Sequence, residues 1–126
     1  MEEEFAKLEG TWTLVKMELN GESRLEKSDK AKLIIKAGKV TLDANYAPKD
    51  ALELSKVLDP SKRPKTITLP YQEKITFYGI YELEADELRL CAEIVETTNE
   101  KDPEARRPKG FDSKKGLLLV FKRENQ

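Results

Sequence analysis

The side chains that could carry out chemistry are few in this sequence. It contains no histidine and a single cysteine, Cys91. These counts exclude Ser-His-Asp and Cys-His nucleophile systems, His-ligated haem, and zinc sites built from histidines or from four cysteines. No sequence cue for an activated thiol accompanies Cys91, so we expect that thiol to be inert. The sequence therefore predicts no metal site, no nucleophilic catalysis and no cofactor.

Pairs of acidic residues are the remaining candidates for catalysis. Glu82 lies near Glu84, and Glu93 lies near Glu96. A glycosidase-like pair needs a cleft and one desolvated acid. The alternation of apolar and polar residues around these pairs places them on a solvent-facing side instead. We therefore predict a protein that is not an enzyme.

Length and charge narrow the class of protein further. The chain has 126 residues, which is enough for one domain with a single core. Its 23 basic and 24 acidic residues give a net charge of −1, which argues against nucleic acid or a polybasic membrane anchor as a partner. No apolar run approaches the roughly 20 residues that cross a bilayer. The acidic start, residues 1–4, carries no signal segment, so the sequence as written predicts a cytoplasmic chain unless a leader has been removed.

Apolar and polar residues alternate with a period of two along most of the chain, which is typical of β-strands. Turn residues divide the alternation into eight expected strands, at residues 11–19, 32–36, 39–43, 51–58, 65–69, 75–83, 88–94 and 116–123. Eight strands can close into a barrel that is either filled by side chains or holds one small ligand. Closure would also remove exposed edges, although an open sandwich fits the pattern too. We therefore predict one all-β domain over residues 1–126, an eight-stranded antiparallel barrel with a short N-terminal helical turn.

The stretch from Glu96 to Lys115 breaks this pattern. Its twenty residues lack strong periodicity and exceed the usual length of a loop. It contains Arg106, Arg107 and one aromatic residue, Phe111. One interpretation is a solvated loop with Phe111 packed on the barrel wall. The other is an entrance flap whose arginines meet an anionic group of a ligand.

The first expected strand begins with Gly10-Thr11-Trp12, which resembles the Gly-x-Trp signature of lipocalins. In lipocalins a basic residue of the last strand packs over the signature tryptophan at the closed end of the barrel. The resemblance implies this role for Arg123, or for Lys122, as a cation–π contact of ~1–2 kcal/mol. Gly10, Trp12 and Arg123 are therefore expected to be structural residues of the closed end.

Longer stretches resemble, in the same order, an uncharacterised lipocalin-like family first described in planctomycetes. They are Leu8–Trp12, Leu58–Ile67, Gly79–Leu83, Leu88–Cys91, Arg107–Pro108 and Leu118–Arg123. The chain departs from the family pattern in residues 43–57 and at Lys109-Gly110. The resemblance implies a calycin-type barrel, with no established reaction and no established ligand.

The candidate ligand site is the inward stripe of two neighbouring strands together with the mouth of the barrel. Tyr81 stands out, because a buried phenol needs a hydrogen-bond partner in the protein or on a guest. The same stripe could instead be an ordinary packed core. The predicted interior and mouth residues are Phe77, Tyr81, Leu90, Ala92, Arg107 and Phe111.

Two functions of different classes follow. The leading hypothesis is non-catalytic binding of a small apolar molecule inside the barrel. The alternative is an interaction or accessory module whose barrel is filled by side chains and which acts through its outer surface or the 96–115 loop. An empty apolar interior would favour the first function and a filled interior the second. The sequence identifies neither a protein partner nor an oligomeric state.

Overall fold

The computed structural model describes residues 2–23, 31–43, 51–72, 74–96, 98, 101–111 and 116–124. Its helices are short: α1 (Glu2–Leu8), α2 (Leu54–Val57) and the 3-10 helix η1 (Pro103–Arg106). The strands are β1 (Gly10–Leu19), β2 (Glu22–Ser23), β3 (Lys32–Lys36), β4 (Lys39–Asp43), β5 (Leu52–Glu53), β6 (Leu58–Asp59), β7 (Thr66–Gln72), β8 (Ile75–Glu84), β9 (Glu87–Glu96) and β10 (Leu117–Arg123). The predicted all-β class is confirmed, and none of these helices is long and apolar enough to cross a bilayer.

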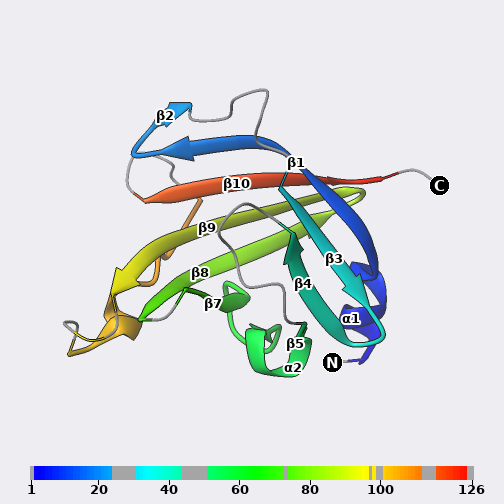
Figure 1. Ribbon diagram of the computed structural model, residues 1–126, viewed down its shortest axis with the longest axis horizontal. Helices are drawn as coiled ribbons and strands as arrows, with labels where there is room; N and C mark the ends of the chain where they lie inside the picture. Colours follow the sequence, from blue (N-terminus) through cyan, green and yellow to red (C-terminus); the bar gives the residue numbers. More distant parts are fainter. Residues whose placement is uncertain are drawn as a thin grey trace.

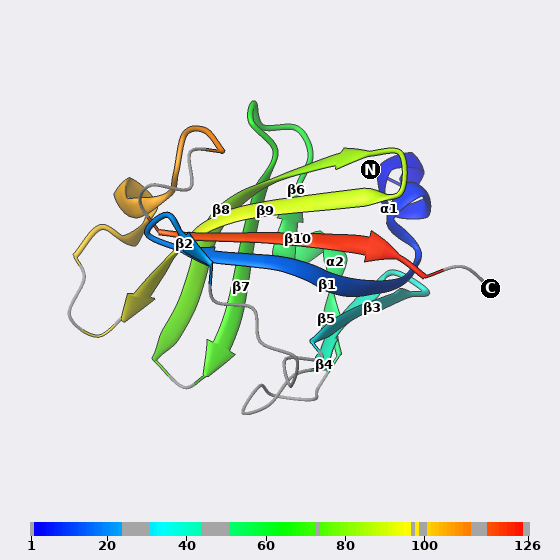
Figure 2. The same ribbon diagram turned by 90° about the horizontal axis from the view of Figure 1, so that it is seen from above.

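The described strands form one antiparallel sheet of ten strands that curls around a common interior (Figure 1, Figure 2). Their order is β5-β4-β3-β1-β10-β9-β8-β7-β6, and β2 pairs with β1. Within the described residues the two end strands, β5 and β6, do not pair with each other. The prediction of a closed eight-stranded barrel is therefore wrong. The molecule is a half-barrel whose two edges are connected through α2.

The segment around α2 explains why the ring stays open. β5 pairs with two residues of β4, and β6 pairs with two residues of β7. Between them, Leu54 and Val57 lie three positions apart, a spacing that puts both on one side of a helical turn. Both side chains are buried in the core. The strand predicted at residues 51–58 is therefore interrupted over Leu54–Val57 by a turn that fills the opening between the sheet edges.

Two apolar clusters lie on opposite faces of the sheet. The larger one fills the inner face and includes Leu8, Trp12 and Phe121. The smaller one, on the outer face of β8, β9 and β10, consists of Ile80, Cys91, Leu118 and Val120. β10 contributes to both clusters because its residues are apolar at successive positions, and successive side chains of a strand point to opposite faces.

At the end of the half-barrel near α1, Trp12 is fully buried and its indole N–H donates to the carbonyl oxygen of Leu8, at 2.8 Å. The guanidinium carbon of Arg123 lies 4.3 Å from the centroid of the Trp12 ring. Arg123 also donates to the carbonyl oxygens of Lys7 and Glu9. Gly10 leaves room for it, since a Cβ there would lie 3.1 Å from the Arg123 Nη1 atom. These contacts connect the first strand, the last strand and α1.

Candidate functional site

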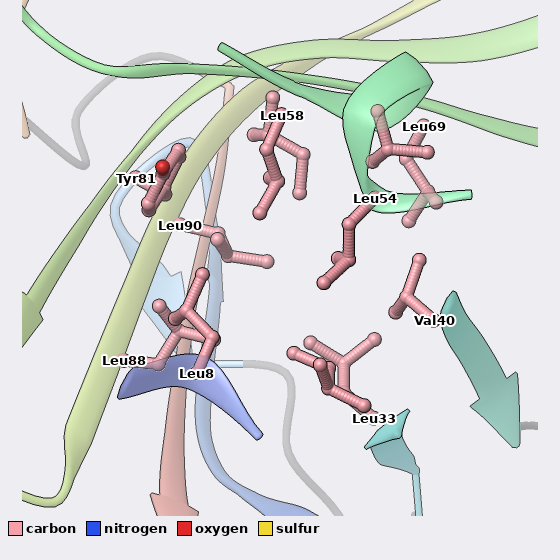
Figure 3. Close-up of a pocket in the computed structure, with 12 residues that line it drawn as sticks. Leu8, Leu33, Val40, Leu54, Leu58, Leu69, Tyr81, Leu88 and Leu90 are labelled. Atoms are coloured by element: carbon pink, nitrogen blue, oxygen red, sulfur yellow. The ribbon is translucent and has the colours of Figure 1, made fainter. Parts of the chain in front are cut away.

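Within the described part of the half-barrel the interior holds two small cavities. Cavity I, of about 20 Å³, lies beside α1 and α2 and includes Leu8, Leu54 and Tyr81 in its lining. Figure 3 shows the side chain of Leu54 pointing into the space between Leu90 and Val40. Cavity II, of about 30 Å³, is lined by residues that face inward from β3, β4, β7, β8, β9 and β10. Both linings are apolar except for the phenol of Tyr81.

These volumes indicate an interior that is nearly filled. A single water needs about 10–15 Å³, whereas a cavity that binds benzene measures about 150 Å³. Each cavity therefore has room for one or two water-sized molecules and none for an organic guest without movement of side chains. Leu33, Ile67, Leu69 and Leu90 line both cavities and separate them.

Four of the six predicted interior and mouth residues lie on the inner face. Phe77 and Ala92 line cavity II, Tyr81 lines cavity I, and Leu90 lines both. The hydroxyl of Tyr81 is buried and has no hydrogen-bond partner among the described residues. Burial, together with the nearby carboxylate of Glu4, holds the pKa of Tyr81 above its usual range. The phenol therefore stays neutral, and its O–H can serve a guest as a hydrogen-bond donor but not as a base.

The other two predicted residues, Arg107 and Phe111, lie on the outer face instead of at a mouth. Phe111 packs against the outer cluster of β8, β9 and β10. Arg107 Nη1 donates to the carbonyl oxygens of Ile67 and Gly79, at 2.8 and 2.7 Å. Its Nη2 donates to Thr68 Oγ1, at 2.7 Å, and both Nη2 and Nε donate to the carboxylate of Glu104.

All five N–H donors of the Arg107 guanidinium are thus used within the chain. No donor is left for an anionic ligand, so the structure does not favour the entrance-flap interpretation for this residue. Arg107 also lies over the Tyr78 ring, 5.2 Å from its centroid. These contacts connect residues 101–111 to β7 and β8 on the outer face of the sheet (Figure 2).

A larger groove lies outside the sheet, between α2, β6 and β7 on one side and residues 101–111 on the other. Its volume is about 660 Å³, and its lining mixes both signs of charge with hydroxyl groups. The lining residues are Ser55, Lys56, Val57, Leu58, Asp59, Lys62, Thr66, Thr68, Glu104 and Arg107. Sequence reasoning missed this groove because its walls come from stretches that are far apart in the chain.

Both carboxylates of the groove are already engaged. The hydroxyl of Ser61 donates to Asp59 and lowers the pKa of that carboxyl. The hydrogen bonds from Arg107 lower the pKa of Glu104. A general acid needs a raised pKa and an accessible proton, so neither carboxyl suits that role. Among the described residues no cluster of three or more histidine, cysteine or acidic side chains could hold a metal ion.

No protein-family model, curated protein or solved structure matches this chain. The likeness to a lipocalin-like family accordingly rests on the sequence motifs.

Proposed function

We propose that this chain is a non-catalytic interaction module. Its interior is filled by its own side chains, and it acts through the outer groove between α2, β6, β7 and residues 101–111. The observation that carries the proposal is the contrast in volume between the two interior cavities, about 20 and 30 Å³, and the groove, about 660 Å³. On this proposal the chain is a lipocalin-like domain of calycin type whose barrel is opened at α2.

The groove has the character of a polar docking surface. Lys56 and Lys62 supply positive charge, and Thr66 supplies a hydroxyl from the outer side of β7. Val57 and Leu58 also border the groove, but their side chains are buried in the inner core and offer little surface to a partner. A surface of this polar and charged character suits a partner that presents charged and polar groups, as the rims of protein interfaces do.

Heteronuclear NMR with a panel of small organic fragments and short peptides tests this function. We expect chemical-shift changes to cluster on groove amides such as those of Ser55, Thr66 and Thr68. Thr66→Trp fills the groove and should abolish these shifts. Thr41→Trp is the matched control, because Thr41 lies on β4, outside the residues that line the groove. Shifts centred on the inner face, no shifts at all, or shifts unaffected by Thr66→Trp would contradict the proposal.

A second candidate function is binding of a small apolar molecule inside the half-barrel. Its support is the apolar lining of both cavities and the four side chains that line both of them. Movement of those side chains would merge the cavities. The buried hydroxyl of Tyr81 would then donate a hydrogen bond to a polar atom of the guest. Binding of an environment-sensitive apolar dye by the wild-type protein tests this candidate.

A further inference from the structure

Residues 101–111, which we call the strap, lie against the outer face of the sheet and pack Phe111 on an apolar patch there. The patch is the cluster of Ile80, Cys91, Leu118 and Val120. All four side chains are buried, and Cys91 is fully buried. Phe111 of the strap packs directly against them. Without the strap, β8, β9 and β10 would present apolar side chains on both faces of the sheet.

The strap itself has a small apolar anchor. None of the η1 residues is buried, and Phe111 is only partly buried. Arg106 forms an ion pair with Glu93 at 3.4 Å, in which the side chain of Arg106 is 45% exposed and that of Glu93 is 15% exposed. Arg107 is different, because its side chain is only 10% exposed and all its donors are bonded. Among the described contacts of the strap, those of Arg107 are the most extensive and the most buried.

The inner core does not depend on the strap. No residue of 101–111 belongs to the inner cluster, which is formed by α1, α2 and the strands. Segments with few buried apolar contacts open at a lower free energy than the rest of a protein. We propose that the strap is a releasable cover, which detaches as a unit while the half-barrel stays folded and thereby exposes the outer apolar patch. Because Glu104 and Arg107 form one wall of the outer groove, opening also dismantles that groove.

The single cysteine of the sequence makes this opening measurable. Cys91 lies in the patch beneath the strap, so its reaction with a chromogenic aromatic disulfide reports strap opening under native conditions. Arg107→Ala should raise the rate of this reaction about ten- to a hundredfold, because hydrogen bonds to a charged group are lost from the closed state alone. Lys109→Ala is the matched control on the same strap, because Lys109 is exposed, and it should change the rate by less than about threefold.

Global stability is followed in the same samples through the fluorescence of Trp12, the single tryptophan, which lies in the inner core. The proposal expects Arg107→Ala to raise the thiol rate much more than it raises the population of the unfolded chain. Equal thiol rates in the Arg107→Ala and Lys109→Ala proteins would overturn it. So would a rise in rate that is fully explained by a loss of global stability.

The wild-type protein supplies an independent test that does not require the variant to fold. The thiol rate is measured at increasing denaturant concentrations below the unfolding transition. Opening of the strap exposes much less surface than global unfolding does, so we expect the rate to depend only weakly on denaturant at low concentrations. The contrary result is a thiol rate that rises with denaturant as steeply as global unfolding does, across the whole range of concentrations. It would show that Cys91 becomes accessible only when the entire molecule unfolds, and it would overturn the proposal.

Discussion

Substitution of Ala92 by phenylalanine measures how full the interior is. Ala92 is almost completely buried on the inner face of β9 and lines cavity II, whose volume is about 30 Å³. The added phenyl ring resembles benzene, for which a cavity of about 150 Å³ is sufficient. The available space is about one fifth of that volume. We therefore expect Ala92→Phe to overpack the core and to lower the free energy of unfolding by ~1–3 kcal/mol or more.

Denaturant titration followed by Trp12 fluorescence gives this free energy directly. Ile94→Phe is the matched control, because Ile94 lies two positions further along β9 and its side chain is 45% exposed. Its free energy of unfolding should stay within about 0.5 kcal/mol of wild type. Wild-type stability in the Ala92→Phe protein would refute the reasoning, since it would show that the interior accepts an aromatic ring.

Three further predictions concern other parts of the molecule. Trp12→Phe and Arg123→Ala should show a coupling energy of about 1 kcal/mol in a double-mutant cycle, because the guanidinium lies 4.3 Å from the ring centroid; strictly additive losses would mean that the contact contributes nothing. Gly79→Ala should cost about 2 kcal/mol of unfolding free energy, since an added Cβ would lie 2.5 Å from the carbonyl oxygen of Cys91; a denaturant midpoint equal to that of wild type would contradict this. Folding lowers the pKa of Glu104 from its ordinary value of 4.5. The ionised Glu104 carboxylate therefore stabilises the folded state above pH 4.5, and this stabilisation is lost as the pH falls through the lowered pKa of the folded protein. The stability difference between wild type and Glu104→Gln should therefore shrink on acidification from about pH 6 to pH 3, and a difference that does not change with pH would contradict the role of the carboxylate.

The long strands could be predicted from the sequence because one face of each is buried. The alternation over residues 75–83 and 88–94 corresponds to β8 and β9, which run to Glu84 and from Glu87 to Glu96. The region of α2 could not be predicted in the same way. Its apolar residues fit both a strand and a helical turn; they are Leu52, Leu54, Val57 and Leu58. Pairing of β5 with β4 and of β6 with β7 makes the two ends of this segment strands and leaves a helical turn between them. Local periodicity therefore does not show whether the ring closes.

The candidate site was predictable only where it follows the strand period. Tyr81 and Leu90 were expected inside, and they line the interior cavities. Arg107 and Phe111 were assigned to a mouth, but they lie on the outer face. The reason is that Arg107 is held by the backbone carbonyl oxygens of Ile67 and Gly79, and no side-chain pattern reveals such partners. The groove was missed for the same reason, since its walls meet only after the sheet has curled.

The most direct test of the central claim is a titration of the wild-type protein with an environment-sensitive apolar dye. Dye emission and the methyl NMR signals of Leu90 and Leu119, which line cavity II, are recorded in the same samples. A filled interior predicts no saturable rise in emission and no shift of either methyl signal. A saturable rise in emission with one dye bound per chain, accompanied by shifts of both leucines, would contradict the account and establish the half-barrel as a binding site for apolar molecules.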